Sequence, residues 1–267
     1  MKRISRLLAL TTSLLLASIT GCTDGNQEGQ QKEGAEKSSV ELVVGGAASL
    51  KDLFEEIGKR FEQNHPGVSI KFNFAGSNII ARQIEAGAPI DVVAFAAEEL
   101  MDHLDTLGLL MPDSRRTFAH NHLCLVVPVN GTLALTNFSD LNGNAIERIA
   151  IASPGVPVRV YTEEALRKIG EWETLLSRFV YGANVRQILS YVEHGEVDCG
   201  FVYTSDTKTR EAARVQIAFE VDEQLHSPIS YPVAILRSSA HAGPTREFVE
   251  YLTSNELREV FRKHGFE

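Results

Sequence analysis

Three short segments of the chain combine small residues with a hydroxyl side chain directly before an expected helix. Residues 45–49 read Gly-Gly-Ala-Ala-Ser, residues 74–78 read Phe-Ala-Gly-Ser-Asn, and residues 202–206 read Val-Tyr-Thr-Ser-Asp. Small residues let the backbone approach a ligand, and the first turn of a helix offers unpaired N–H donors with a partial positive charge. Two such turns that face each other can bind an anion without a cationic side chain. The alternative is ordinary helix capping, for which serine is common, and Ser49 with Asp52 approximates a capping box.

Motifs for catalysis or metal binding are weak by comparison. The sequence has neither the Gly-x-Ser-x-Gly elbow of hydrolases nor the Gly-x4-Gly-Lys-Ser loop that binds nucleoside triphosphates. His120 and His122 could point the same way on a strand, but no carboxylate or third histidine lies near them in the sequence. We therefore expect a binding protein with no enzyme activity, no metal centre and no cofactor.

Alternating strand-like and helix-like segments must position these turns. Apolar runs typical of buried strands occur at residues 40–44, 68–74, 91–96, 123–129, 149–152, 197–203, 215–219 and 231–236. Helical spacing occurs at residues 50–63, 78–86, 98–107, 161–169, 185–194, 244–253 and 255–264. Four of these helices are predicted to end at the C-cap glycines Gly87, Gly108, Gly170 and Gly195. Repeated strand, turn and helix units are typical of α/β sheets with helices on both faces, and 267 residues favour two such sheets. Ligands of such sheets bind beyond the carboxyl ends of the strands, where these turns lie.

The composition is that of an ordinary globular protein, with 43% hydrophobic and 23% charged residues. The formal net charge is −9, from 26 basic and 35 acidic residues. A strongly acidic chain is a poor partner for nucleic acid or for an anionic membrane surface, because phosphate binding depends on basic patches. Any anion must therefore be held by a local arrangement of donors.

The first 22 residues have the features of a lipoprotein signal peptide. A basic start is followed by an apolar run over residues 7–19, which is shorter than the roughly 20 residues of a spanning helix. Residues 19–22 (Ile-Thr-Gly-Cys) resemble a bacterial lipobox, in which the cysteine is lipidated and becomes the new N-terminus. We expect removal of residues 1–21, lipidation of Cys22, and a flexible polar tether over residues 22–39. The alternative is a plain signal peptide with a chance cysteine.

Two further cysteines, Cys124 and Cys199, lie in apolar, strand-like runs without the spacing of a metal or redox motif. A disulfide between them would be compatible with an oxidising compartment. Two separate buried thiols, which behave as small hydrophobic residues, are the favoured interpretation.

Longer stretches of the chain resemble the periplasmic molybdate-binding proteins, which deliver the ion to ABC-type membrane transporters. The most specific matches are residues 81–89 (Ala-Arg-Gln-Ile-Glu-Ala-Gly-Ala-Pro) and residues 202–206. Further matching stretches, in the same order along residues 40–267, are 47–50, 74–77, 121–128, 164–172, 184–186, 231–234 and 264–266.

The resemblance implies an α/β, two-lobed periplasmic-binding-protein fold of type II, with hinge strands between the lobes and the ligand in the cleft. Lobe I would comprise residues 40–119 and 217–267, and lobe II residues 120–216. It also implies an extracytoplasmic, monomeric protein that binds an ABC transporter permease and is held at the membrane only by its lipid.

The ligand contacts of the family carry over to residues in both lobes. Ser49 and Ser77 would supply hydroxyl and backbone N–H donors from lobe I. Val185 would supply a backbone N–H at a helix start, and Tyr203 its phenol, from lobe II.

One further donor falls where this chain departs from the family. A Val-Pro-Ala-Gly stretch of the family reads Val-Pro-Val-Arg here, so that Val158 takes the alanine position and Arg159 the glycine position. Glycine permits backbone angles that arginine rarely adopts, so this loop could be reshaped. Arg159 could enter the cleft as an extra contact or point to solvent. The outward position is favoured, because the next residues begin a helix whose buried face constrains the chain.

A pocket of donors suits molybdate and tungstate, which are dianions with four acceptor oxygens and no proton at neutral pH. Hydrogen phosphate carries a proton that needs an acceptor, and sulfate is smaller, so donors spaced for the larger ion would stay unpaired. The predicted function is the capture of molybdate and tungstate for an ABC transporter. Alternatives are the binding of sulfate or another tetrahedral oxyanion, a ligand-sensing regulator domain and an extracytoplasmic hydrolase. The signal peptide argues against the regulator.

Overall fold

The structure, a computed structural model, describes residues 39–267. The predicted signal peptide, the lipidation site Cys22 and all but the end of the predicted tether lie outside the described residues. None of the helices within residues 39–267 is long and apolar enough to cross a membrane.

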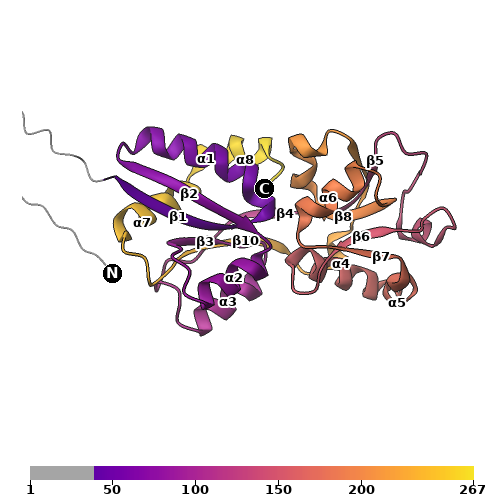
Figure 1. The fold of residues 1–267 in the computed structure, drawn as a ribbon, viewed down its shortest axis with the longest axis horizontal. Coiled ribbons are helices and arrows are strands. Elements are labelled where there is room, and N and C mark those ends of the chain that lie inside the picture. The colour runs from indigo at the N-terminus through magenta and orange to yellow at the C-terminus, as the bar shows by residue number, and fades with distance from the viewer. Residues whose placement is uncertain (1–38) are drawn as a thin grey trace, which may run out of the picture. The chain divides into compact units, whose positions relative to one another are not determined.

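Two mixed five-stranded sheets form the framework of residues 39–267 (Figure 1). The first sheet has the order β2-β1-β3-β10-β4, with β1 (Val40–Ala47), β2 (Val68–Ala75), β3 (Val92–Ala94), β4 (Arg116–Asn121) and β10 (Ile229–Ile235). The second has the order β7-β6-β8-β5-β9, with β5 (Leu123–Pro128), β6 (Ile149–Ala152), β7 (Phe179–Gly182), β8 (Cys199–Tyr203) and β9 (Val215–Glu220). Each sheet forms one lobe with its helices, which confirms the predicted two-lobed α/β fold.

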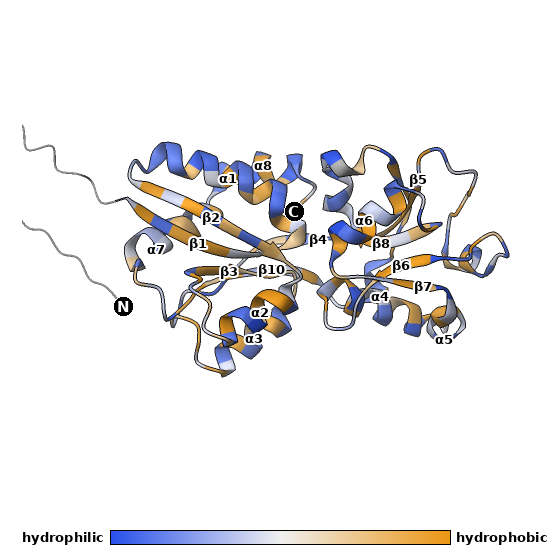
Figure 2. Cartoon of the chain, in the orientation of Figure 1, coloured by the Kyte–Doolittle hydropathy of each residue, from blue (hydrophilic) through white to orange (hydrophobic). Residues whose placement is uncertain are grey.

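Helices cover both faces of the first sheet. One face carries α1 (Lys51–Asn64), α7 (Ala242–Leu252) and α8 (Arg258–Lys263), and the other carries α2 (Ser77–Glu85) and α3 (Glu98–Thr106). The apolar spacing of α1 buries Leu53, Phe54, Ile57 and Phe61, as periodicity predicts. Figure 2 shows the strands as mainly hydrophobic, whereas the outer turns of α1 are hydrophilic. The apolar faces therefore hold the helices against the sheet.

The second sheet is flanked by α4 (Pro157–Lys168), α5 (Trp172–Leu175) and α6 (Val185–Glu193). Helix α4 begins four residues earlier than the predicted start at residue 161. Pro157 occupies its first turn, where a missing N–H costs nothing and the fixed φ suits the helix. Strands β4 and β7 and the short helix α5 were not predicted from the sequence.

Glycines end several helices where the sequence predicts C-caps. Gly87, Gly108, Gly170 and Gly195 have φ values of +83°, +67°, +80° and +67°. These left-handed angles strain any residue with a Cβ, so glycine is the natural helix stop. Each glycine thus turns the chain back toward the next strand.

The chain crosses between the lobes twice. One crossing lies between β4 and β5, at residue 122, and the other between β9 and β10, at residues 221–228. The sequence-based lobe boundaries, after residues 119 and 216, fall inside β4 and β9. Each of these strands stays whole within one sheet, because β4 is hydrogen-bonded to β10 and β9 to β5.

Cys124 and Cys199 are free and buried, which confirms the favoured interpretation of two separate thiols. In the pairing of β5 with β8, Cys124 lies opposite Val202, and Cys199 is therefore offset from it along the strand. Burial raises the pKa of both thiols, so they remain protonated and inert at neutral pH.

Candidate ligand-binding site

A small cavity lies between the two lobes. Six of its lining residues come from lobe I and six from lobe II. Those of lobe I are Ala47, Ala48, Ser49, Gly76, Ser77 and Ala96, and those of lobe II are Val156, Pro157, Val158, Asn184, Val185 and Tyr203. The cavity thus contains all five residues that the resemblance implies as ligand contacts. Its described lining combines small and apolar residues with hydroxyl and amide groups, and it contains no charged side chain.

Two neighbouring parallel strands bring the lobe I serines together. Strands β1 and β2 end side by side, with Ala47 opposite Ala75. The chain then enters η1 (Ala48–Leu50), which contains Ser49, and α2, which begins at Ser77. Both serines are at most 4% exposed. Because the carboxyl ends of parallel strands share one edge of the sheet, both helix starts face the same cavity.

The second lobe repeats this arrangement. Parallel strands β6 and β7 also end side by side, with Ala152 opposite Gly182, and lead into α4 and α6. Asn184 caps α6, where its side chain accepts hydrogen bonds from the second and third backbone N–H groups of the helix, at 3.0 and 3.1 Å. The N–H groups of Val158 and Val185 belong to the first turns of these helices, where helix geometry supplies no acceptor. They are therefore available to a ligand.

The hydroxyl of Tyr203 has no hydrogen-bond partner among residues 39–267, although it is fully buried. Tyr203 ends β8 and is 1% exposed. Burial raises the pKa of its phenol, which keeps the group protonated as a donor. Leaving a buried hydroxyl unpaired costs about 1–3 kcal/mol. A ligand in the cavity that accepts a hydrogen bond from Tyr203 would remove this cost.

The hydroxyl protons of both serines are left for the cavity. The Ala96 N–H donates to Ser77 Oγ at 3.2 Å, so the proton of Ser77 is not used in that bond. Ser49 Oγ lies 3.1 Å from the Tyr231 hydroxyl, which in turn accepts from Asn121 Nδ2 at 3.2 Å. Since Tyr231 accepts from Asn121, its own proton can go to Ser49, and the proton of Ser49 stays free for an acceptor.

Asn121 is oriented by the backbone at the crossing between the lobes. Its Oδ1 accepts from the His122 N–H at 2.9 Å and from the Thr204 hydroxyl at 3.0 Å, and its Nδ2 also donates to Ser205 Oγ at 2.8 Å. This buried network supports Ser49 through Tyr231. Sequence reasoning missed both Asn121 and Tyr231 as supporting residues, although each lies in a stretch that resembles the family.

Glycine is required at position 76 by the close approach of the lobes. A Cβ on Gly76 would lie 3.1 Å from the backbone oxygen of Ala183 in lobe II, and 2.8 Å from Asn78 Oδ1. A larger residue would therefore push the α2 start away from the opposite lobe.

Arg159 lies outside the cavity, as the favoured prediction had it. Its side chain is packed against other residues, however, and does not point to solvent. Its side chain is 11% exposed, and its Nε donates to Glu163 at 3.0 Å. The guanidinium lies 4.5 Å from the ring centroid of Trp172. Its backbone N–H donates to the Val156 carbonyl at 3.0 Å, as in a regular first turn. The arginine at the glycine position of the family is thus accommodated within α4.

The predicted capping box at Ser49 is wrong. Among the described residues, no side chain caps η1 or α1. The Asp52 carboxylate instead faces Arg186 of lobe II at 2.5 Å. Tyr161 makes a second contact between the lobes, since its hydroxyl donates to the Ala96 carbonyl at 3.2 Å. Both contacts join lobe I to lobe II.

The two histidines that could have formed a metal site lie at the crossing between the lobes. His122 contacts Glu223 through Nδ1, at 2.6 Å, and Glu267 through Nε2, at 3.1 Å. No group of three or more His, Cys, Asp or Glu residues able to hold a metal occurs within residues 39–267.

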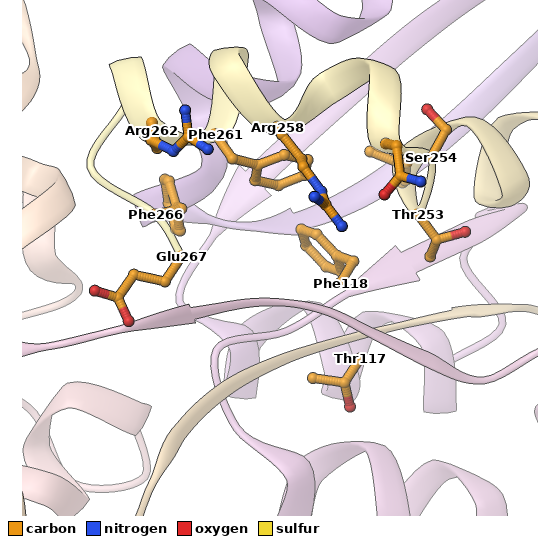
Figure 3. Close-up of a pocket in the computed structure, with 11 residues that line it drawn as sticks. Thr117, Phe118, Thr253, Ser254, Arg258, Phe261, Arg262, Phe266 and Glu267 are labelled. Carbon is orange, nitrogen blue, oxygen red and sulfur yellow. The ribbon is translucent and has the colours of Figure 1, made fainter.

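A second hollow lies on lobe I, between β4 and the C-terminal helix (Figure 3). Its lining includes Phe118, Phe261, Arg258 and Arg262. Both arginines are exposed, and Arg262 is already paired with Glu259. An anion there would compete with bulk water, so the cavity between the lobes is the stronger candidate.

Comparisons with known proteins agree with this geometry. The family model described as bacterial extracellular solute-binding protein matches residues 42–267. YvgL of Bacillus subtilis (strain 168), provisionally named an ABC transporter substrate-binding lipoprotein, is 37% identical over 99% of this chain and 98% of its own length. The molybdate-binding protein ModA of Escherichia coli (strain K12) is 33% identical over 84% of this chain and 88% of its own. The periplasmic molybdate-binding protein of Azotobacter vinelandii shares the fold, with a TM-score of 0.77 and 23% identity over 85% of this chain and 98% of its own.

Proposed function

The chain belongs to the bacterial extracellular solute-binding protein family, and we propose that it captures molybdate and delivers it to an ABC transporter. The cavity between the lobes is the proposed site. The ion would be bound by Ser49 and Ser77 from lobe I and by Val158, Val185 and Tyr203 from lobe II. Arg159 takes no part, because it is held by Glu163 and Trp172 outside the cavity.

The buried, unpartnered hydroxyl of Tyr203 carries this proposal. It faces a cavity into which four strand ends lead, each followed by a helix start. Helix N-termini attract anions through their free N–H groups and their dipoles. The described lining supplies donors and no carboxylate, which suits an anion without a proton.

The chemistry of the donors favours molybdate and tungstate over other tetrahedral anions. Hydrogen phosphate would bring an O–H group that finds no carboxylate acceptor in the lining. Sulfate lacks this problem, so its rejection would depend on the longer reach of the larger ions. Donors that cannot reach the smaller ion would stay unpaired, which would reduce the binding free energy by about 1–3 kcal/mol for each buried group.

The location and partner are part of the same proposal. The signal peptide and Cys22 would place the protein outside the cytoplasm on a lipid anchor, with residues 22–39 as a tether. The name of the B. subtilis relative, which matches along 99% of this chain, supports a lipoprotein. The protein would act as a monomer and present the closed lobes to the permease of an ABC transporter.

Calorimetric titration of the mature domain, from about residue 40, tests the proposal. Separate titrations with molybdate, tungstate, sulfate and phosphate should show one-to-one binding of the first two and much weaker binding of the others. Heat with sulfate and none with molybdate would reassign the ligand. The absence of binding to all four anions would refute the anion site.

A further inference from the structure

Arg186 reaches across the cleft from lobe II to lobe I. It is the second residue of α6, and its side chain is 16% exposed. Its Nε donates to the Ala48 carbonyl at 3.2 Å, and a terminal nitrogen lies 2.5 Å from Asp52 Oδ2. Both of these partners belong to lobe I, at the start of η1 and α1.

A second carboxylate anchors the same guanidinium within lobe II. Asp206 is fully buried, and its Oδ1 lies 3.7 Å from Arg186 Nε. The other oxygen of Asp206 accepts from the Tyr203 backbone N–H at 3.0 Å. Arg186 therefore lies between one carboxylate from each lobe, and its contacts with Asp52 and Ala48 depend on a closed cleft.

This arrangement is coupled to the donors of the cavity. Ala48 directly precedes Ser49, and Arg186 directly follows Val185. Asp206 is hydrogen-bonded to the backbone of Tyr203. Three of the five proposed ligand contacts are thus directly linked to the contacts of Arg186. Ser49 and Val185 are chain neighbours of Ala48 and Arg186. Tyr203 is hydrogen-bonded to Asp206, which lies beside Arg186.

We propose that Arg186 and Asp52 are positioning residues that hold the cleft closed around the bound anion and so set the rate at which it is released. The proposal rests on the proposed function of the cavity as the anion site. Neither residue lines the cavity, so their effect passes through the lobe positions rather than through contact with the ligand.

The sign of the charge on Asp52 makes the proposal testable. If Asp52 acted only through its electrostatic repulsion of the ligand, removal of this negative charge near the cleft would strengthen the binding of a dianion. If the residue holds the cleft closed, the same removal weakens binding, because the lobes separate more easily. The two explanations predict opposite changes for one conservative substitution.

The experiment compares Asp52→Asn with the matched variant Asp102→Asn in the mature protein. Asp102 pairs with Arg115 at 2.5 Å, but both residues lie in lobe I, so this pair does not cross the cleft. Each substitution changes the net charge equally. Release is followed by exchange of radioactive molybdate for an excess of unlabelled molybdate, and the dissociation constant by calorimetry.

We expect release from Asp52→Asn to be about tenfold faster than from the parent, which corresponds to about 1.4 kcal/mol in the closed state. The association rate should stay within about threefold, because the ion enters the open form, in which Asp52 and Arg186 are apart. Asp102→Asn should match the parent in both rates. Equal or slower release from Asp52→Asn, or a change confined to association, would overturn the proposal.

Small-angle X-ray scattering of the unliganded proteins tests the closure contact without any ligand. Asp52→Asn should have a larger radius of gyration than the parent and Asp102→Asn, since its lobes lose an attraction. Equal radii would overturn the proposal. A parent that binds no anion would refute the proposed function, and scattering would then still decide the role of the pair.

Discussion

Replacement of Tyr203 by phenylalanine removes one oxygen atom from the cavity and leaves the packing of the ring in place. The ring centroid lies 6.4 Å from that of Tyr161 and 6.1 Å from that of Tyr231, and these contacts do not involve the hydroxyl. The hydroxyl is buried and has no partner within residues 39–267. Without ligand, the unpaired hydroxyl therefore raises the free energy of the closed form. In the complex, it would donate a hydrogen bond to an anionic oxygen.

The expected change in affinity follows from these two states. A hydrogen bond to a charged group is worth about 1.5–3 kcal/mol, so its loss should raise the dissociation constant for molybdate by about tenfold to 150-fold. The unliganded protein should not become less stable, because no hydrogen bond within the described chain is lost. Relief of the unpaired hydroxyl should even favour the closed form without ligand.

Calorimetric titration and thermal unfolding of the unliganded protein measure the two effects separately. Tyr181→Phe is the matched control, because Tyr181 is 47% exposed and does not line the cavity. The control should keep the affinity and the melting temperature of the parent. An unchanged affinity of Tyr203→Phe, or a melting temperature clearly below that of the control, would refute the role of the hydroxyl as a ligand donor.

Three further predictions concern residues outside the cavity. Arg159→Ala should keep molybdate affinity within about threefold but lower the melting temperature, since its largely buried cation–π contact with Trp172 is worth up to about 2 kcal/mol. A hundredfold loss of affinity would place Arg159 in the site. Burial raises the pKa of Asp206 from 3.8 to about 6, so the folded state holds its proton at higher pH than the unfolded state. The contribution of Asp206 to the free energy of unfolding should therefore fall, by roughly 3 kcal/mol, as the pH rises from about 4 to above 6. Denaturant unfolding at several pH values should show a shallower fall for Asp206→Asn, and equal slopes would contradict the assignment. Cys22→Ala should leave the membrane fraction or fail to mature; recovery in the same membrane pool as the parent would refute lipidation.

Local sequence was sufficient for the parts of the site that depend on one strand and the turn after it. The turns at residues 45–49 and 74–78 were predicted as helix starts with donors, and they lie together in the cavity. The C-cap glycines at positions 87 and 195 were predicted for the same reason, because a helix stop depends on few neighbouring residues. The resemblance to a family added Val158 and Val185, whose side chains carry no chemical signal.

Sequence pattern did not predict elements whose formation depends on distant neighbours. Strand β4 (Arg116–Asn121) has two adjacent apolar residues, Phe118 and Ala119, between polar pairs, so it shows neither alternation nor an apolar run. Its pairing with β10 makes it a strand. Strand β7 has only four residues and becomes recognisable through its parallel pairing with β6. Short strands carry too little periodicity to be identified by themselves.

The partners of polar side chains were decided by the tertiary structure alone. Asp52 was assigned to a local cap at Ser49, yet its carboxylate pairs with Arg186, which lies 134 residues further along the chain. Likewise, the Tyr231 hydroxyl reaches Ser49 across 182 residues. Spacing along the chain identifies only those partners of a side chain that lie a few residues away. The order of the strands and the docking of the lobes bring together groups that are far apart in the sequence. The sequence therefore predicted the donors of the site, and only the fold determined which residues orient them and hold the lobes closed.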